Sequence, residues 1–209
     1  MKIAVAAANG KAGKLIVQEA VDRGMDVTAF VRDENKTAAQ HTVVKDIFDI
    51  VEEDLMGFDA VVDAAGAWTP DTVHIIPDAA KHLADLLKDK DTRLVVVGGA
   101  GSLFVDAEHA KTVFDVTPFP EEAVPVVKNH QIALDLLREY DDVNWTYISP
   151  AGDFQADGER TGKYILAGEE LKLNSKGESV ISYADYAIAM VDEIESGDHI
   201  KQRISVVSE

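Results

Sequence analysis

Short apolar runs alternate along the first 150 residues with segments in which apolar side chains recur every three to four positions. The β-rich runs predict strands that are buried on both faces, and the 3.6-residue period predicts amphipathic helices. Strands that alternate with helices indicate parallel strands joined by crossover helices, so we expect an α/β fold with a doubly wound parallel sheet. The expected strands cover residues 2–8, 26–32, 42–46, 59–66, 93–99 and 144–149, and the helical segments cover residues 13–23, 47–55, 77–89 and 121–140.

Two segments depart from this alternation. Residues 100–122 form a longer connection than a strand and a helix require, and we expect them to build a substrate wall. Residues from about 155 to 209 predict short strands, a helix and a closing strand, and Ser182 with Asp185 three positions later resembles a capping box. This tail is too short for an independent domain. We therefore expect one domain over residues 1–209, with a small C-terminal extension on the substrate side of the sheet.

Composition and charge narrow the class of protein. The chain has no cysteine, which excludes disulfides, thiolate metal sites and a cysteine nucleophile, and fits a cytoplasmic protein. No stretch approaches the ~20 apolar residues of a membrane helix. The formal charge of −18, from 38 acidic and 20 basic residues, disfavours binding to nucleic acid or to anionic membranes. We expect a soluble protein whose partners are small molecules.

The segment AAANGKAG, residues 6–13, follows the first predicted strand and opens the first predicted helix. A turn of this kind directs backbone N–H groups and the positive end of the helix toward one point, which favours a pyrophosphate. Gly10 and Gly13 stand where the turn and the helix–strand contact need glycine, but Ala7 replaces a third one. We expect Ala7 to be tolerated in extended backbone and Asn9 to accept a left-handed turn. The hypothesis is a dinucleotide site, and the alternative is a structural turn.

The end of the second strand suggests which dinucleotide binds. An acid at this position takes the ribose hydroxyls of NAD, whereas an arginine accommodates the 2′-phosphate of NADP. Here Arg32 ends the strand and Asp33 follows it. The guanidinium of Arg32 suits a phosphate dianion, so we expect NADP(H) to be preferred over NAD(H). The alternative for Arg32 is a solvated side chain, and Lys11 and Lys14 either add positive charge or are plain surface residues.

Six segments together resemble a known family. They are AAANGKAG, VTAFVRDENK, VVKDIFD, RLVVVGGAGSLF, WTYISPAGDF and GERTGKYILAG. They resemble the atypical short-chain dehydrogenases of the NADH-flavin reductase group, relatives of biliverdin reductase B, and the similarity runs nearly from end to end. The resemblance implies a Rossmann-like domain that binds NADP or NAD and transfers hydride to a flavin or a flavin-sized acceptor.

The resemblance also implies positions for the coenzyme. Asp46 and Ile47 correspond to the adenine contact, the segment after the fourth strand to the ribose and phosphate contacts, and the ends of the fifth and sixth strands to the nicotinamide side. These positions agree with the rule that ligands bind at the carboxyl ends of parallel strands. The expected cofactor-binding residues are Asn9, Gly10, Lys11, Ala12, Gly13, Arg32, Asp46, Ile47, Ala64, Ala65, Gly66, Gly99, Pro150 and Ala151.

Candidate catalytic groups are few. No tyrosine has a lysine four residues later, so the Tyr-x-x-x-Lys chemistry of alcohol dehydrogenases is disfavoured. Ser102 is a candidate to bind the carboxamide or a substrate carbonyl, or else a turn serine. His130 is a candidate proton donor, or else a hydrogen-bonded structural histidine. Trp68 and Phe154 either offer flat surfaces for a ring or serve packing. The remaining histidines have no metal-binding spacing, so no metal site is expected.

Three functions stay open. The first is a reductase that passes hydride from NADPH to a flavin or a similar small acceptor, with FMN or FAD as a substrate rather than a bound prosthetic group. The second is a regulatory protein that senses NADP(H) without turnover. The third, an epimerase or dehydratase acting on a nucleotide-linked sugar, is disfavoured because Tyr-x-x-x-Lys is missing. Both a monomer and a homodimer are compatible with the sequence.

Overall fold

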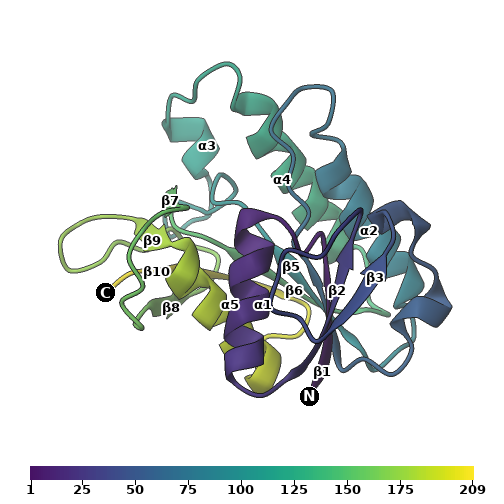
Figure 1. Ribbon diagram of the computed structural model, residues 1–209. Helices are drawn as coiled ribbons and strands as arrows, with labels where there is room; N and C mark the ends of the chain where they lie inside the picture. Colours follow the sequence, from purple (N-terminus) through teal and green to yellow (C-terminus); the bar gives the residue numbers. More distant parts are fainter.

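The computed structural model describes residues 1–209 and has one central sheet of eight strands in the order β3-β2-β1-β4-β5-β6-β10-β8 (Figure 1). All neighbouring strands are parallel except β10 and β8. The strands are β1 (Lys2–Ala6), β2 (Asp26–Val31), β3 (His41–Val44), β4 (Ala60–Asp63), β5 (Arg93–Val97), β6 (Asn144–Ser149), β8 (Ile165–Ala167) and β10 (Gln202–Val207). The order reverses between β1 and β4, which is the Rossmann-like arrangement and the expected place for a ligand.

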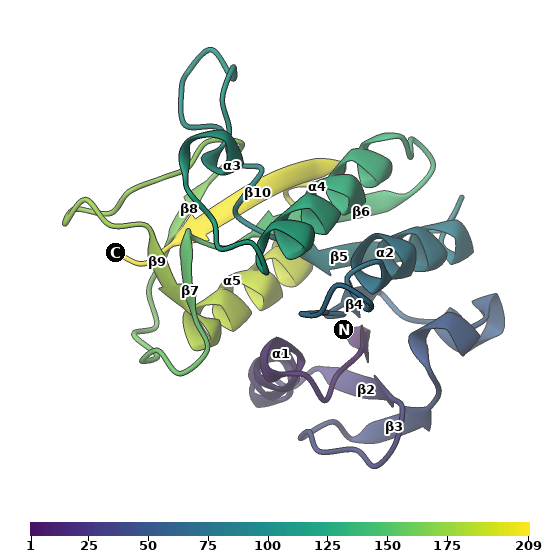
Figure 2. The ribbon, with the colours of Figure 1, turned by 90° about the horizontal axis from the view of Figure 1, so that it is seen from above.

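Four helices cover the two faces of the sheet. On one face α1 (Lys11–Asp22) lies beside α5 (Tyr183–Ser196), and on the other α2 (Ile75–Leu86) lies beside α4 (Val124–Arg138), as the view from above shows (Figure 2). A short helix, α3 (Val113–Val116), stands over the connection that follows β5. None of the helices combines the length and the apolar character that crossing a membrane requires.

Alternate residues of the strands pack into two separate hydrophobic cores, one on each face of the sheet. In β1, Ile3 and Val5 pack toward α1 and α5, whereas Ala4 and Ala6 pack with residues of α2 and α4. Successive side chains of a strand point to opposite faces, so a strand with no polar residue fills both cores. The expectation of a doubly wound sheet is therefore confirmed; its central strands are buried, whereas the edge strand β3 is mostly exposed.

The segment 47–55 is not the helix that its period predicts. It forms two 3₁₀ turns, η1 (Ile47–Asp49), which Asp46 caps, and η2 (Glu52–Leu55), whose third residue Asp54 bonds back to the N-cap. Asp46 accepts from the N–H of Phe48 at 3.0 Å, and Asp54 accepts from the N–H of Val51 at 2.9 Å. Such local side-chain bonds compete with a continuous helix.

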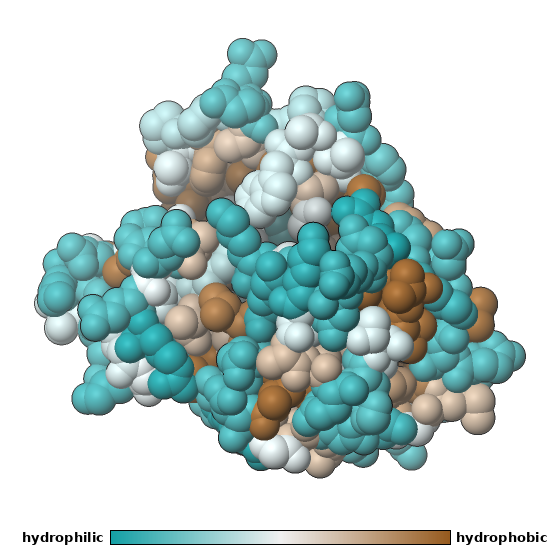
Figure 3. Space-filling model, in the orientation of Figure 1, coloured by the Kyte–Doolittle hydropathy of each residue, from teal (hydrophilic) through white to brown (hydrophobic).

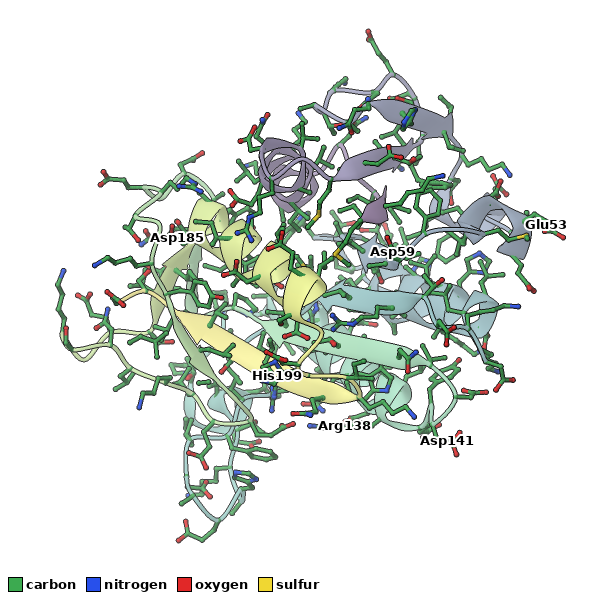
Figure 4. All side chains as sticks on the ribbon, turned by 90° about the horizontal axis from the view of Figure 1, so that it is seen from below. Glu53, Asp59, Arg138, Asp141, Asp185 and His199 are labelled. Carbon is green, nitrogen blue, oxygen red and sulfur yellow. The ribbon has the colours of Figure 1, made fainter.

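The C-terminal tail does more than cover the substrate side. Residues 152–182 contain the edge strand β8 and a separate small pair of strands, β7 (Asp153–Gln155) and β9 (Val180–Ser182). The helix α5 and the strand β10, however, complete the sandwich itself. At the opposite edge, Glu193 of α5 pairs with Arg93 at 2.7 Å and with His199 at 2.7 Å, and Figure 4 shows His199 beside the strand it precedes. The tail is thus an integral part of the domain.

Candidate coenzyme site

The predicted coenzyme residues gather along one edge of the sheet. They follow the carboxyl ends of β1, β2, β3, β4, β5 and β6, and these strands are parallel and adjacent. Figure 3 shows a hollow on this side of the molecule, between the part that carries α3 and α4 and the part that carries α1. Segments distant in the sequence are therefore close in space, as the rule for open α/β sheets requires.

The start of α1 has free hydrogen-bond donors. No group in the protein accepts a hydrogen bond from the backbone N–H of Lys11, Ala12 or Gly13, and Gly10, which caps the helix, has no side chain to do so. The first turn contains no acid, and the side chains of Lys11 and Lys14 are exposed and form no ion pair. Free N–H groups at the positive end of a helix suit a pyrophosphate.

The two glycines of this loop serve different purposes. A Cβ on Gly13 would lie 2.8 Å from the carbonyl oxygen of Ala8 and 2.9 Å from that of Ala7, so the close helix–strand contact requires glycine. A Cβ on Gly10 would meet only the oxygen of Ala7, at an ordinary 3.5 Å, and its φ of −66° suits any residue. The protein itself does not need glycine at position 10, which fits a position where a ligand approaches the backbone.

The left-handed residue of the loop is Ala7, not Asn9. Ala7 has a φ of 57°, so the expectation that it is extended is wrong, and Asn9 has no positive φ. The conformation of Ala7 turns its carbonyl toward the N–H of Gly10, which it accepts at 3.1 Å. An alanine in this conformation costs about 1 kcal/mol that glycine would avoid.

Arg32 stands directly after β2 and is exposed, with no hydrogen bond or ion pair to any other residue. The following turn is held against the glycine loop, because Asn9 bonds to Asp33, Glu34 and Lys36. A guanidinium that has no partner at this edge has its donors free for an anion. The turn that Arg32 begins therefore lies against the glycine loop, and the part of Arg32 in binding stays a prediction.

The segments after β3 and β4 line the same edge. Asp46 caps the η1 turn through its side chain, and the half-buried Ile47 packs on the core. Ala64 and Ala65 are partly exposed and Gly66 is exposed after the end of β4. Their small side chains leave backbone groups accessible to a ligand.

Sequence reasoning missed Asp63, the last residue of β4. Its side chain is 3% exposed, and its Oδ1 accepts a hydrogen bond from the N–H of Ala65 at 3.0 Å. Burial raises the pKa of Asp63 to about 7, and the bond from Ala65 opposes this only in part. The signal in the sequence that could have identified Asp63 is an acid directly after the apolar residues of a predicted buried strand. Asp63 fixes the turn that carries Ala64 and Ala65.

The glycines after β5 are needed by the protein. A Cβ on Gly98 would lie 2.3 Å from the ring of Tyr147, and one on Gly99 would lie 2.9 Å from the ring of His130. Tyr147 is fully buried, accepts from the N–H of Gly99 at 3.0 Å and donates to the carbonyl of His130 at 3.1 Å. The segment GGAG is therefore packed tightly under α4.

His130 faces this segment without a partner. Neither ring nitrogen is hydrogen-bonded within the protein, and Nδ1 is buried. The predicted alternative of a hydrogen-bonded structural histidine is therefore wrong. Burial lowers the pKa of His130 to about 4, so the ring is neutral at pH 7. It can donate one N–H to a ligand, but it is not a charged acid, which weakens its assignment as a proton donor.

Ser102 is hydrogen-bonded to Arg203, a second residue that the sequence analysis did not single out. Its hydroxyl accepts from Arg203 at 3.0 Å, its carbonyl accepts from the same guanidinium at 3.2 Å, and the residue is 6% exposed. The side chain of Arg203 is fully buried and also pairs with Glu169. A lone arginine in an apolar closing strand was the available signal. These contacts give Ser102 a structural role, and its part in catalysis stays a prediction.

The remaining aromatic and strand-end candidates differ in whether they are buried or exposed. Pro150 and Ala151 are buried at the end of β6, beside the end of β5. Phe154 packs in an aromatic cluster with Tyr183 and Tyr186, with ring centroids 4.0 and 4.8 Å apart. Trp68, in contrast, is 72% exposed on the connection after β4. Of the two aromatic platforms considered, only Trp68 has a free face.

The motif GERTGKY is fixed by one buried acid. Asp185, at the start of α5 (Figure 4), accepts from the N–H groups of Thr161 and Gly162 and from the hydroxyl of Thr161. Ser182 caps the helix by accepting from the N–H of Asp185 at 3.0 Å. Only half of the predicted capping box forms, because the carboxylate holds the motif instead of the N-cap backbone.

Residues 100–122, the expected substrate wall, line a cavity together with α4. A cavity of about 420 Å³ lies between α3 and α4, lined by Gly101, Thr112, Phe114, Asp115, Val127, Lys128, Gln131 and Ile132. Val127 of this lining lies one helical turn before His130, on the same side of α4, and Gly101 belongs to the segment GGAG that follows β5. The cavity therefore borders the packed segment after β5.

Comparisons with known proteins agree with this geometry. A family model described as NAD(P)H-binding matches residues 7–196. The uncharacterized protein YwnB of Bacillus subtilis is 46% identical over 212 residues, which cover 100% of this chain and 99% of YwnB. A solved structure from Streptococcus pneumoniae, provisionally named an NADH-flavin reductase, is 53% identical over 100% of both chains, with a TM-score of 0.97. Another from Bacteroides thetaiotaomicron, provisionally named an epimerase, is 33% identical over 99% of this chain and 96% of that chain, with a TM-score of 0.85.

Proposed function

Because the chain belongs to the family of NAD(P)H-binding proteins, we propose that it is a reductase that binds NADP(H) in preference to NAD(H) and passes hydride to a flavin or a similar small acceptor. The observation that carries the proposal is the row of unpaired donors at one edge of the sheet. The unpaired N–H groups at the start of α1 suit a pyrophosphate, and Arg32 after β2 suits a 2′-phosphate. The acceptor is suggested by the streptococcal relative's name.

The chain's own residues bind and orient the reactants. The bound dinucleotide supplies the hydride, so the protein has to place two rings against each other and exclude water. The ends of β5 and β6 meet at Gly99 and Pro150, where the ring of His130 lies against Gly99 with neither nitrogen bonded within the protein. Because His130 is neutral at pH 7, its expected role is to donate a hydrogen bond that positions a ring, rather than a proton.

One observation favours a second function, an NADP(H)-sensing protein without turnover. The nicotinamide side holds no charged proton donor, since His130 is neutral, and the hydroxyl of Ser102 is bound by Arg203. Epimerase chemistry has weaker support, because no tyrosine is followed by a lysine four residues later.

The first experiment follows the loss of NADPH absorbance when the pure protein is mixed with NADPH and FMN. A reductase consumes NADPH above the rate without protein, and the rate saturates with FMN. Tight NADPH binding without consumption across several flavin and quinone acceptors would select the sensing function instead. Retained oxidised coenzyme with no net consumption would favour an epimerase.

The second experiment titrates NADPH and NADH into wild type and Arg32→Ala. Loss of the guanidinium removes charge-assisted bonds to the 2′-phosphate, so NADPH binding should weaken about tenfold or more while NADH binding hardly changes. Arg160→Ala is the control, because Arg160 is an exposed arginine whose partner is Glu19 in α1 and not the turn after β2. An unchanged NADPH:NADH ratio in Arg32→Ala would contradict the preference for NADP.

A further inference from the structure

The turn after β2, residues 32–36, is held by one side chain of the glycine loop. The Oδ1 of Asn9 accepts from the N–H of Lys36 at 2.8 Å. Its Nδ2 donates to the carbonyl of Glu34 at 2.8 Å and to the carboxylate of Asp33 at 3.3 Å. One amide therefore bonds to three of the five residues of the turn, across 24 to 27 positions of sequence.

No other side chain ties this turn to the glycine loop. Asn35, the other asparagine of the region, bonds only to Thr37 in the same connection and to Thr42 in β3. Gln40 fixes the far end of the connection through Val27 and Met25. The position of residues 32–36 relative to α1 thus depends on Asn9.

Among the charged side chains of the turn, Asn9 bonds only to the acid Asp33 and to neither cation. Asp33 follows β2 at the place where an acid takes the ribose hydroxyls of NAD, and here its carboxylate receives a bond from Asn9. The cations on either side, Arg32 and Lys36, are exposed and have no partner in the protein. Because the carboxylate of Asp33 is engaged and the cations Arg32 and Lys36 are free, the turn favours a ribose that carries a phosphate over a ribose with two free hydroxyls.

We propose that Asn9 is a positioning residue that sets the coenzyme preference of this site: it joins the pyrophosphate loop to the turn after β2, engages Asp33, and leaves Arg32 directed at a 2′-phosphate. The inference rests on the proposed binding of NADP(H). Asn9 acts here through Arg32 and through the turn, and the selected ligand class is a dinucleotide with a phosphorylated adenosine ribose.

The test compares Asn9→Ala with Asn35→Ala. Asn9→Ala frees the turn and Asp33, so NADPH binding should weaken about tenfold while NADH binding changes less than about threefold. Asn35→Ala removes a similar number of bonds from the same turn but keeps the link to the glycine loop, so its NADPH:NADH ratio should stay near that of wild type. In an Arg32→Ala background, Asn9→Ala should have no further effect on the ratio, because Asn9 acts through Arg32.

A second readout needs no coenzyme. The amide hydrogen of Lys36 should exchange slowly in wild type and in Asn35→Ala, and fast in Asn9→Ala, since Asn9 is its only acceptor. If Asn9→Ala does not fold, Asn9→Asp serves instead: it keeps the acceptor for Lys36 but loses the donor to Asp33 and Glu34. Lys36 should then stay protected while the NADPH:NADH ratio falls.

The outcomes separate this inference from the proposed function. Wild type that binds neither coenzyme would overturn both. Wild type that prefers NADPH, together with an unchanged preference in Asn9→Ala, would overturn the role of Asn9 alone. A further tenfold loss in the Arg32→Ala background would also overturn it, because the effect would then not pass through Arg32.

Discussion

The two glycine-rich segments of the chain, residues 6–13 and residues 98–101, lie on the same edge of the sheet but relate oppositely to their surroundings. Around Gly10 the backbone donors have no partners and a side chain would fit without a clash. At Gly98 and Gly99 an added side chain would collide with Tyr147 and His130, and Tyr147 already bonds to the N–H of Gly99. Glycine alone therefore does not mark a ligand site; glycine that the protein itself does not need is the better signal.

The two halves of the site also differ in the polar groups that they offer to a ligand. The half near α1 carries free N–H groups and a free arginine, so it has the means to bind a dinucleotide. The half near β5 is packed by internal bonds, and its polar groups are either neutral, as in His130, or already bound, as in Ser102. Under the proposed function, the chain therefore supplies the binding groups, and the coenzyme supplies the reactivity.

The largest effect is expected at the packed segment. In Gly98→Ala the new Cβ would lie 2.3 Å from the ring of Tyr147 and 2.8 Å from the carbonyl of Ile148. Tyr147 cannot move aside cheaply because both of its hydroxyl bonds hold it, so the free energy of unfolding should fall by about 3 kcal/mol. Urea unfolding measures this. A change below about 1 kcal/mol would mean that the segment is looser than its contacts indicate.

Asp63, between the two segments, gives a pH-dependent effect. In the folded protein the pKa of Asp63 is about 7, above its ordinary value near 4. Between about pH 4 and pH 7 the folded state therefore binds more protons than the unfolded state. The free energy of unfolding falls as the pH rises through this range. Asp63→Asn keeps an acceptor for the N–H of Ala65 and removes the charge. Its stability relative to wild type should therefore increase by about 2 kcal/mol between pH 5.5 and pH 8. Parallel stability curves for the two proteins would contradict the raised pKa.

At the open segment, binding should suffer and stability should not. In Gly10→Ala the Cβ meets only the oxygen of Ala7 at 3.5 Å, so the free energy of unfolding should change by less than about 1 kcal/mol. The methyl group would occupy the space in front of the helix start, and NADPH binding should weaken about tenfold or more. Calorimetric titration and thermal unfolding of the same sample measure the two effects. Full affinity in Gly10→Ala would place the pyrophosphate elsewhere.

The smallest effect concerns Ala7. Glycine relieves the cost of a φ of 57°, and the greater freedom of the unfolded chain offsets part of the gain. Ala7→Gly should therefore stabilise the protein by about 0.5–1 kcal/mol. Ala8→Gly, at a buried neighbouring position, should destabilise it and serves as the control. A loss of stability in Ala7→Gly would show that the turn is not strained.

The sequence was sufficient for the sheet and for the edge on which the predicted coenzyme residues lie. Alternating apolar and periodic segments predicted the parallel strands, and the carboxyl-end rule grouped Gly10, Arg32, Gly66 and Pro150 on one edge. These inferences depend on local periods and on strand direction, which a single sequence carries.

Contacts between distant segments could not be predicted in this way. The bonds from Asn9 to the turn after β2, from Arg203 to Ser102 and from Asp185 to Thr161 join residues 24 to 101 positions apart. The conformation of Ala7 was missed for the same reason, since only the packing of α1 on the sheet fixes which residue of the loop turns left-handed. The 3₁₀ turns of residues 47–55 were missed because acids that cap locally overrode the helical period.

The most direct test of the account observes the backbone N–H groups of Lys11, Ala12 and Gly13 by NMR while NADPH is added. Because these donors have no partner in the protein, they should form new hydrogen bonds to the pyrophosphate, and their amide resonances should shift strongly and saturate with NADPH. Amides of the packed segment near Gly98 should shift less. Saturable NADPH binding that leaves the three amides at the start of α1 unshifted would contradict the account.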